Sequence, residues 1–539
     1  MIWLVWGTLR FRRESGAPLI SIPQSFNAAT YFVERHALEG TGSAIAIECD
    51  TERVSYQQLL ERTNRVGNVL RHLGVRMEER VALLLPDSPE FLYVFFGAIK
   101  IGAVAVPLNT YLQAGDYEYL LNDARSRLLF VHESLLPTVE SIPRERLRHL
   151  EKIVVIGGHE TGSFADLMRT ASPHLEAAPT CKDDAAFWLY SSGSTGTSKA
   201  CIHLHHDMVV CSELYAKGIL KMTAQDRCYS VARLFFAYGL GNTGYFPLAC
   251  GATAILSAQR PDPATIYANI ERFRPTLFFS VPSNYVALLA YQDPGGKEFD
   301  LSSLRQAVSA GESLPAPLFE RFRDRFGVEI LDGLGSTEAL HMVISNCPGD
   351  ARPGSSGKII PGYEARLVDE ADRDIVQGEI GSLLLKGDSI CAGYWNQHEK
   401  TKRSFEGAWF RTGDKYYQDE DGYYWYAGRS DDLFKVNGRW LNPAEVESAL
   451  IAHPAVREAV VVAREDASKL TKPAAYVVVQ SDVRPDDDLV RTLQEWVTQR
   501  IGAYKRPRWI EFLPELPKTA TGKLQRYKLR ELQARRLST

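Results

Sequence analysis

Short apolar runs alternate with helix-length segments over residues 81–345, and this alternation constrains the fold more than any other feature. Runs such as VALLLP, RLLFVH, KIVVIGG and TLFFSVP have the length and composition of buried strands. Amphipathic stretches at 56–73 and 263–273 have the periodicity of helices. The alternation predicts a parallel sheet with helices packed on its faces. In such folds ligands bind at the carboxyl ends of the strands, so we expect the chemistry there.

The pattern changes twice towards the C-terminus. After residue 354, RLVDE, GSLLLKG and YYWYAG are short alternating strands separated by Gly and Asp turns, as in a small barrel or meander. After residue 429, two strand candidates (EAVVVARE and AAYVVVQ), a helix at 489–501 and a Pro/Lys/Gly-rich tail have the size of a small independent domain. The charged, glycine-flanked junction at 428–439 suits a hinge.

We therefore predict an α/β protein. We expect it to contain more than one domain, because 539 residues exceed what a single core organises. The predicted large N-terminal domain, 21–430, contains two βαβ-type sheets plus a small β-barrel and binds the ligands. The predicted C-terminal domain, 431–539, is small, mobile and α+β.

Composition excludes several functional classes. A net charge of −4 without a long basic run argues against nucleic acid as a partner. Eight cysteines without a Cys-x-x-Cys pair argue against a disulfide framework or a zinc site, and favour a reducing, cytoplasmic compartment. His203, His205 and His206 have no second ligand cluster, so we interpret them as polar residues at the start of a helix.

The first residues, MIWLVWGTLRFRRESG, are apolar and then basic. This stretch is too short to span a bilayer, and it has no basic residue before the apolar run, as a signal peptide requires. We interpret 1–20 as a disordered or non-native leader. The apolar region 91–108 is interrupted by Gly97, Lys100 and Gly102, and predicts a buried helix followed by a strand. No membrane partner is expected.

The strand AAFWLY continues into SSGSTGTSKA, which has the composition of a phosphate-binding loop. Gly193 and Gly196 let backbone N–H groups approach phosphate oxygens, and hydroxyl side chains and Lys199 add further donors. The loop is not of the Walker type, because Lys199 lies between Ser198 and Ala200. The alternative, a flexible Ser/Gly linker, is disfavoured by the position between a buried strand and an amphipathic helix.

The loop YSSGSTGTSKA resembles the signature of the adenylate-forming superfamily, which includes acyl- and aryl-CoA ligases, adenylation domains of peptide synthetases and firefly luciferase. The usual loop ends in Pro-Lys-Gly, so Ser198 and Ala200 depart from it without removing a side-chain donor or the lysine. Further signatures of the family follow in order: DGLGSTE (332–338), GDSICAGYWN (387–396), WFRTGD (409–414), GRSDDLFKVNGRWLNPAEVE (428–447) and PKTATGKLQR (517–526). Their order and spacing carry the resemblance.

The resemblance implies a reaction in two steps. A carboxylate attacks the α-phosphate of ATP and releases pyrophosphate, and the thiol of coenzyme A then displaces AMP. The protein mainly positions the reactants and offsets developing charge. The implied cofactors are ATP, Mg²⁺ and coenzyme A.

The resemblance also assigns residues to roles. Glu338 would hold Mg²⁺, Thr337 would contact the α-phosphate, and Lys523 would reach the carboxylate and α-phosphate in the first step only. Asp431 would be the hinge about which the small domain rotates between the steps. The implied nucleotide- and CoA-binding residues are Ser191, Ser192, Gly193, Ser194, Thr195, Gly196 and Lys199 in the loop, Ala310, Gly311, Glu312, Asp332 and Gly333 around the adenine, Asp414 and Arg429 at the ribose, and Lys435 and Gly438 in the segment that approaches after rotation.

Two segments indicate the acid. RLFFAYGLGNTGYFPL (233–248) and STEALHMVISN (336–346) resemble the pocket segments of benzoate-type CoA ligases. An apolar slot with one hydroxyl fits a planar ring better than a flexible chain. The candidate substrate residues are Phe236, Ala237, Tyr238, Gly239, Gly335 and His341. Alternatively, Phe235, Phe236 and Tyr238 are ordinary core aromatics. Benzoate, hydroxybenzoates and aminobenzoates remain open.

Two other functions compete with an aryl-CoA ligase. An adenylating enzyme that loads a carrier protein in trans would share the pocket and the first step. A luciferase-like or inactive homologue is disfavoured because Lys199, Glu338, Asp414, Asp431 and Lys523 are all retained. A homodimer is also left open.

Overall fold

The computed structural model describes residues 20–157, 163–192, 198–429, 434–436, 439–466, 470–518 and 524–537. The predicted leader at 1–20 lies outside these residues except for Ile20, which is buried. The alternation of strands and helices predicted from the hydrophobic pattern is confirmed, and it forms two large sheets.

The first sheet has six strands in the order β6-β5-β3-β4-β7-β8. All neighbours run parallel except β7 and β8. The strands are β3 (Arg80–Leu84), β4 (Val104–Pro107), β5 (Leu128–His132), β6 (Lys152–Ile156), β7 (Ala185–Ser192) and β8 (Ser198–Leu204). Their interiors are almost entirely apolar because both faces are covered, as parallel sheets require.

The structure corrects two expectations around the phosphate loop. The loop does not join a strand to a helix; it joins the antiparallel strands β7 and β8. Of the three histidines, only His206 lies at the start of a helix, as the residue before α7 (Asp207–Cys211). His203 lies within β8, and both His203 and His205 are fully buried. Both imidazoles form hydrogen bonds with distant segments in the interior, and the hydrophobic pattern of a sequence does not predict such bonds.

The second sheet has nine strands in the order β15-β14-β13-β12-β11-β9-β10-β1-β2. A parallel centre from β13 to β1 is flanked by antiparallel strands at both edges. The strands are β1 (Ile45–Glu48), β2 (Arg53–Ser55), β9 (Arg227–Ser230), β10 (Thr253–Ile255), β11 (Leu277–Ser280), β12 (Gln306–Ser309), β13 (Ile330–Gly335), β14 (Met342–Ser345) and β15 (Lys358–Ile359). Residues of both sheets, among them Phe187 and Phe279, belong to one continuous hydrophobic core.

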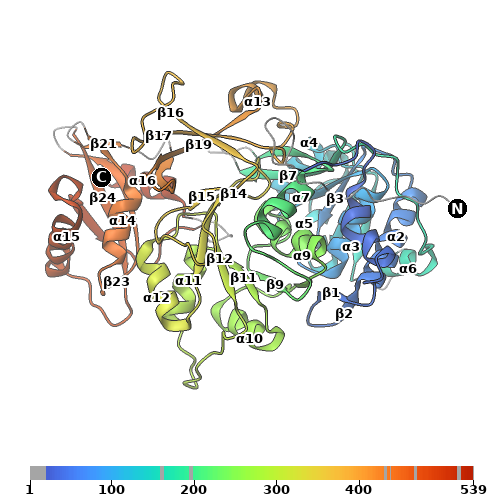
Figure 1. Cartoon of the computed structure of the whole chain (residues 1–539), viewed down its shortest axis with the longest axis horizontal. Coiled ribbons are helices and arrows are strands. Elements are labelled where there is room, and N and C mark those ends of the chain that lie inside the picture. Colours follow the sequence, from blue (N-terminus) through green and yellow to red (C-terminus); the bar gives the residue numbers. More distant parts are fainter. Residues whose placement is uncertain are drawn as a thin grey trace.

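Helices cover the sheets (Figure 1). The larger ones are α2 (Tyr56–His72), α3 (Pro89–Lys100), α4 (Ala114–Asp123), α10 (Pro263–Phe273), α11 (Pro282–Ala290) and α12 (Ala316–Phe326). The shorter ones are η1 (Thr30–Glu34), α1 (Arg35–Leu38), η2 (Glu133–Leu135), α5 (Leu136–Glu140), η3 (Arg144–Arg146), α6 (Phe164–Thr170), α7, η4 (Ser212–Lys217), α8 (Ala237–Gly239), η5 (Leu240–Tyr245) and α9 (Phe246–Cys250). Helix α2 begins at a capping box, in which Ser55 and Gln58 satisfy each other's backbone N–H groups. The predicted buried helix in 91–108 is confirmed as α3, which precedes β4.

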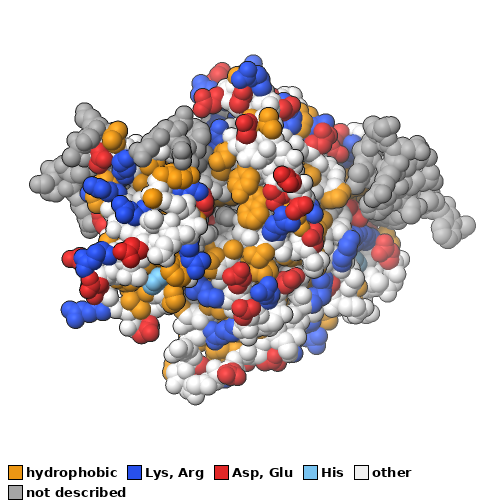
Figure 2. Space-filling model, turned by 60° about the vertical axis from the view of Figure 1, so that its left-hand side comes forward, with side chains coloured by type: hydrophobic (Ala, Val, Ile, Leu, Met, Phe, Trp, Pro, Cys, Tyr) orange, Lys and Arg blue, Asp and Glu red, His pale blue; other side chains and the backbone are white. Residues whose placement is uncertain are grey.

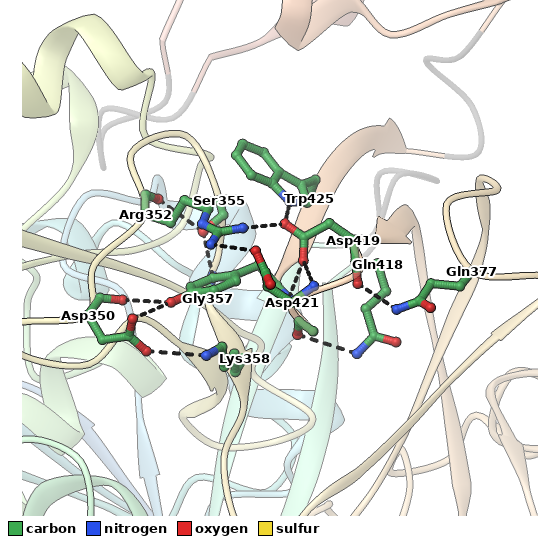
Figure 3. Close-up of polar contacts among 12 residues, drawn as sticks. Asp350, Arg352, Ser355, Gly357, Lys358, Gln377, Gln418, Asp419, Asp421 and Trp425 are labelled. Carbon is green, nitrogen blue, oxygen red and sulfur yellow. Dashed lines mark hydrogen bonds and ion pairs between the residues drawn. The ribbon is translucent and has the colours of Figure 1, made fainter.

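A third, antiparallel sheet follows, as the change in pattern predicted. It contains β16 (Glu364–Val368), β17 (Gly381–Lys386), β18 (Phe405–Glu406), β19 (Trp409–Gln418) and β20 (Tyr424–Arg429), with α13 (His398–Ser404) before β18. Arg352, from the segment between β14 and β15, joins this sheet to the nine-stranded one (Figure 3). Its guanidinium donates to Asp419 at 2.8 Å and Asp421 at 2.9 Å, and Trp425 donates to the same Asp419 oxygen. A fork of fixed donors suits two carboxylates on one turn.

The C-terminal part is a smaller α+β unit beside α12 (orange to red in Figure 1). It contains β21 (Phe434–Val436), β22 (Arg439–Leu441), α14 (Pro443–Ile451), β23 (Val456–Glu465), β24 (Thr471–Val479), α15 (Asp487–Ile501), η6 (Ala503–Lys505), β25 (Trp509–Phe512) and α16 (Arg526–Leu537). Its core is separate from those of the sheets described above. The predicted fold class, a large N-terminal α/β part followed by a small α+β part, is confirmed.

The described surface carries mixed charge. On the face that Figure 2 shows, basic and acidic side chains are interspersed and form no extended basic patch. Within the described residues, no helix combines the length and apolarity needed to cross a membrane. The same residues contain no cluster of three or more His, Cys, Asp or Glu side chains arranged to hold a metal.

The close packing of α2 against α3 yields a stability prediction. A Cβ atom on Gly97 of α3 would lie 2.7 Å from Val66 Cγ1 and 3.1 Å from the Thr63 carbonyl oxygen. We therefore expect Gly97→Ala to lower the free energy of unfolding by about 1–3 kcal/mol, the usual cost of overpacking. Urea denaturation followed by tryptophan fluorescence measures this.

Gly115 of α4 provides the matched control. A Cβ atom there would meet no heavy atom within 4 Å. We expect Gly115→Ala to be neutral or to stabilise the protein by up to about 1 kcal/mol. Equal effects of the two substitutions would contradict the packing argument.

Candidate active site

Three segments meet at the carboxyl edge of the nine-stranded sheet. The parallel strands β9, β12 and β13 are followed by residues 233–239, 310–312 and 336–341, respectively. These segments contain the predicted aryl pocket, the predicted adenine site and Glu338. The expectation that the chemistry lies at this edge therefore agrees with where the candidate residues gather.

Lys199, Glu338 and Tyr394 form a tight triangle of side chains. Lys199 Nζ lies 2.7 Å from Glu338 Oε1 and donates a hydrogen bond of 2.7 Å to the Tyr394 hydroxyl. The Tyr394 hydroxyl in turn donates to Glu338 Oε1 at 2.8 Å, and its ring lies beneath the ammonium at 4.0 Å. The triangle joins β8, the loop after β13 and the segment after β17.

The triangle keeps Glu338 ionised. Burial alone would raise the pKa of this carboxyl, but the Lys199 charge and the hydrogen bonds from Lys199 and Tyr394 outweigh it, so the pKa lies below its ordinary value. Burial and the Lys199 charge also lower the pKa of the nearby Lys400. The result is an ionised carboxylate, Glu338, beside the cations Lys199 and Lys400. These cations could also offset the negative charge of a phosphate group.

Helix α4 holds both ends of the phosphate loop. The Tyr190 hydroxyl, before the loop, donates to Asp123 at 2.7 Å, and Tyr119 donates to the Ser198 carbonyl, after the loop, at 2.9 Å. Ser191 and Ser192 pair with Lys199 and Ser198 across the β7–β8 ladder. Gly193, Ser194, Thr195, Gly196 and the side chain of Ser192 lie outside the described residues.

The two predicted ribose residues are neighbours. Asp414 of β19 and Arg429 of β20 are opposite each other in the antiparallel ladder. The Arg429 guanidinium lies 3.4 Å from the Asp414 carboxylate, which is largely buried. A carboxylate held in this way can accept hydrogen bonds from two adjacent hydroxyls.

The predicted adenine residues occupy two adjacent strand ends. Gly311 has a φ of 90°, which allows the sharp turn between Ala310 and Glu312. Asp332 is buried, its carboxylate accepts from the Leu314 N–H at 3.2 Å, and burial raises its pKa well above the ordinary value. Gly333 follows it within β13.

Glu312 also contacts the C-terminal part. Its Oε1 accepts a hydrogen bond of 2.5 Å from the Leu524 N–H. Leu524 directly follows Lys523, which lies outside the described residues, as do Asp431 and Gly438; of Lys435 only the backbone is described. A bridge between Lys518 and Leu524 closes the loop that carries Lys523.

His341 lies in a box of aromatic rings at the predicted aryl pocket. The rings of Tyr215, Tyr238 and Phe246 lie 5.2, 5.5 and 4.5 Å from the imidazole, and Nε2 is 3.1 Å from the Asn242 amide oxygen. Burial lowers the pKa of His341 to about 3, so the imidazole is neutral near pH 7. It can offer shape and one hydrogen bond there, but no charge.

The other residues predicted for the aryl pocket differ in how deeply they are buried. Phe235 is buried and packs on Tyr111, whereas Phe236 and Tyr238 are only partly buried. The core interpretation therefore describes Phe235 best. Ala237 is buried as the first residue of α8.

Gly239 and Gly335 are explained by close backbone approach. A Cβ on Gly239 would lie 2.1 Å from the Arg233 carbonyl oxygen, and one on Gly335 would lie 2.6 Å from the His341 carbonyl oxygen. Both glycines shape the pocket segments, whatever occupies the pocket.

Comparison with known proteins decides the family. The AMP-binding enzyme family matches residues 33–395, and the AMP-binding enzyme C-terminal domain matches residues 445–523. The chain belongs to the AMP-binding enzymes. The resemblance to adenylate-forming ligases is thereby confirmed.

Full-length relatives of this AMP-binding enzyme include two ligases of aromatic acids. The chain is 47% identical to the benzoate–CoA ligase of Thauera aromatica, with 95% of this chain and 97% of that protein covered. It is 44% identical to the 4-hydroxybenzoate–CoA/benzoate–CoA ligase of Rhodopseudomonas palustris, with 94% of each covered.

Two solved structures have the same fold as this AMP-binding enzyme. The anthranilate CoA ligase AuaEII in complex with anthranoyl-AMP has a TM-score of 0.91 and 44% identity, covering 95% of this chain and 98% of that one. A benzoate CoA ligase from Burkholderia xenovorans LB400 has a TM-score of 0.86 and 41% identity, covering 94% of this chain and 100% of that one.

Several residues that position the site escaped the sequence argument. Tyr394 lies in the family motif GDSICAGYWN, so the sequence marked its segment but did not indicate its contact with Lys199 and Glu338. Arg233, a lone charge at the start of an apolar pocket segment, was also detectable: it donates to the Ser257 carbonyl at 2.6 Å and lies 3.6 Å from Asp87. Asp123 of α4 carries no local signal, because its partner Tyr190 is distant in the sequence.

The buried pair in this AMP-binding enzyme makes a pH-dependent prediction. We expect Lys199→Met to destabilise the protein by about 3–5 kcal/mol at pH 7, because it leaves a buried carboxylate without its cation. In the variant, burial places the pKa of Glu338 above its ordinary value of 4.5 instead of below it. Protonation relieves the penalty in the variant as pH falls through that raised pKa, while the wild type keeps the contribution of its pair until pH falls below 4.5, so the difference should shrink between pH 7 and pH 5.

The double variant Lys199→Met/Glu338→Gln is the control. It has neither charge, so its free energy of unfolding should recover most of the loss and depend less on pH. Urea denaturation at pH 7 and pH 5 measures all three proteins. A difference between wild type and Lys199→Met that does not change with pH would contradict the argument.

Proposed function

We propose that the chain is an ATP-dependent aromatic carboxylate–CoA ligase, which forms an aryl-adenylate and then an aryl-CoA thioester with release of pyrophosphate and AMP. The observation that carries the proposal is the loop 336–341. It places Glu338, at the end with the charged triangle, three residues from His341, at the end with the aromatic box. Full-length relatives that are ligases of benzoate and hydroxybenzoate support the same substrate class.

The residues of the chain divide the work of the first step. The hydroxyl groups of 191–195, the backbone of the loop and Lys199 would hold the phosphates, and Thr337 would contact the α-phosphate. Asp414 and Arg429 would hold the ribose, with the segments 310–312 and 332–333 at the adenine. Phe236, Tyr238 and the neutral His341 would hold the ring, so that its carboxylate points towards the α-phosphate.

Glu338 fits a magnesium site of the kind that nucleotides complete. Mg²⁺ is usually held by one or two carboxylates together with substrate phosphates and water, and Glu338 is an ionised carboxylate beside the phosphate loop. When bound, the ion would neutralise phosphate charge. Lys199, which contacts Glu338 Oε1, would offset the charge of the same carboxylate from the protein side.

The second step would use the C-terminal part. We propose a division into 21–430 and 431–539, with Asp431 as the hinge. The contact between Glu312 and Leu524 supports an arrangement for the first step, because it brings the loop that carries Lys523 to the adenine segment. After rotation, Lys435 and Gly438 would approach the site and coenzyme A would replace Lys523. The homodimer and the cytoplasmic location stay predictions.

The class of the acid and the acceptor can be tested together. Pyrophosphate release should be fast with benzoate, hydroxybenzoates or aminobenzoates, and at least about 100-fold slower with fatty acids of 8–16 carbons, because a closed aromatic box excludes a long chain. Acyl-CoA should appear only when coenzyme A is present. A phosphopantetheinyl carrier protein offered instead of coenzyme A is the matched control, and preferred transfer to it would overturn the ligase assignment in favour of carrier loading.

Lys523 should act in the first step only. We expect Lys523→Ala to lower adenylate formation by at least about 100-fold, because one positioned charge on the reacting phosphate is lost. Thioester formation from supplied aryl-adenylate should stay within about threefold of wild type. Normal pyrophosphate release by this variant, or equal loss in both half-reactions, would remove Lys523 from the proposed role.

A further inference from the structure

His203 lies in the interior, four residues beyond Lys199 on strand β8. Neither its side chain nor that of Asp207 is exposed to solvent. Its ring stacks on Phe187 of β7, with centroids 5.0 Å apart and an interplanar angle of 16°. A polar ring held flat at a buried strand position is costly unless its nitrogens are used.

Both ring nitrogens face acceptors. Nε2 lies 2.8 Å from the Thr337 carbonyl oxygen, which can only accept a hydrogen bond. Nδ1 lies 2.8 Å from Asp207 Oδ2, which also accepts from the Leu204 N–H at 3.2 Å. Nε2 must therefore carry a proton, and a second proton must lie between Nδ1 and Asp207. The two side chains together hold two protons and are neutral as a pair.

The partner of this pair is the loop that carries Thr337 and Glu338. Its successive carbonyl groups are each engaged: Thr337 by His203, Glu338 by the Cys391 N–H at 2.8 Å, and Ala339 by the Ser389 hydroxyl at 2.9 Å. Near the end of the loop, Leu340 has a φ of 68°, which is unusual for a residue with a side chain. These contacts fix the plane of each peptide from which the functional side chains project.

Strand β8 therefore holds the loop at two places. Lys199 contacts the Glu338 side chain near the phosphate loop, and His203, four residues further along the strand, contacts the Thr337 backbone. We propose that His203, paired with Asp207, is a positioning residue that fixes Thr337 and Glu338 for the α-phosphate and its magnesium ion. This inference rests on the proposed ATP-dependent function, but not on which acid is activated.

Stability alone gives little reason for a buried ion pair at this place. Removing two charges from water costs about as much as their contact returns, and apolar side chains of similar size often stabilise a protein equally well. What an apolar pair cannot provide is a directed N–H at Thr337. Removal of such supporting hydrogen bonds commonly costs about 10–100-fold in metal affinity or activity.

The test removes the directed donor without leaving a buried charge. In His203→Leu/Asp207→Asn, the asparagine keeps an acceptor for the Leu204 N–H. We expect about 10–100-fold weaker binding of ATP in the presence of Mg²⁺, measured by calorimetry without any acid, and about a twofold change at most without Mg²⁺. The KM for the aromatic acid should change by no more than about twofold, while kcat for pyrophosphate release falls by about 10–100-fold. Unchanged binding of Mg²⁺ and ATP would overturn the inference.

Two further variants separate positioning from packing. His203→Gln keeps an N–H donor close to the place of Nε2 and should retain magnesium-dependent ATP binding within about fivefold of wild type. His206→Gln is the matched control, because His206 Nε2 lies 3.3 Å from the other oxygen of Asp207 and contacts the Asp388 carbonyl instead of Thr337. It should bind Mg²⁺ and ATP as the wild type does. A loss in His206→Gln as large as that in His203→Leu/Asp207→Asn would overturn the inference.

A measurement on the unaltered protein decides the matter even if the double variant does not fold. In protein labelled with ¹⁵N-histidine, the ring signals absent from His203→Gln belong to His203. We expect a protonated Nε2 whose signal moves when Mg²⁺ and ATP bind, since Thr337 would then contact phosphate. A signal that does not move would overturn the inference. Failure of pyrophosphate release with every carboxylic acid would instead count against the proposed function alone.

Discussion

The contact of Lys199 with Glu338 and Tyr394 fixes the two large sheets and the segment after β17 relative to one another at the candidate site. Each side chain comes from a different place: β8 of the six-stranded sheet, the loop between β13 and β14 of the nine-stranded sheet, and the segment that follows β17. Separating these three segments costs free energy, because breaking a buried pair leaves an uncompensated charge. The groups that would bind phosphate and magnesium are thus the groups that join the sheets. Nucleotide binding as proposed would then replace one set of charge contacts with another at a fixed junction.

The loop 336–341 transmits that constraint to the acid pocket. Its carbonyls are held by β8 and by residues 389–391, and His341 at its far end is enclosed by three aromatic rings. The distance between the ends is therefore set by six residues of backbone with little freedom. A reaction that needs the carboxylate in line with the α-phosphate benefits from such a fixed separation, because the entropy of alignment is lost on folding and not during the reaction.

Hydrophobic pattern predicted the strands and their order of appearance, because each buried strand must be apolar whatever its neighbour is. It could not predict the β7–β8 hairpin, since pairing direction depends on the loop between the strands. It also wrongly predicted that His203 lies at the start of a helix. The partners of His203 are Asp207, close by in the sequence, and Thr337, far from it, and neither contact produces a periodic pattern. Motif order indicated Glu338 and Lys199. It assigned no role to Tyr394, the third member of the triangle, although Tyr394 lies within the motif GDSICAGYWN. Side-chain pairing across distant segments is decided by the fold.

The neutral His341 limits how an acid could lie in the proposed aryl pocket. With a pKa of about 3, it cannot compensate a carboxylate near pH 7, and its immediate neighbours there are aromatic rings and the Asn242 amide. Because burying an ionised carboxylate without a cation is strongly unfavourable, an acid bound as proposed would have its ring at this box and its carboxylate outside it. Glu338, three residues before His341 on the same loop, is paired with the cation of Lys199 from β8. The absence of charge at one end and its concentration at the other would orient the substrate before any catalytic group acts on it.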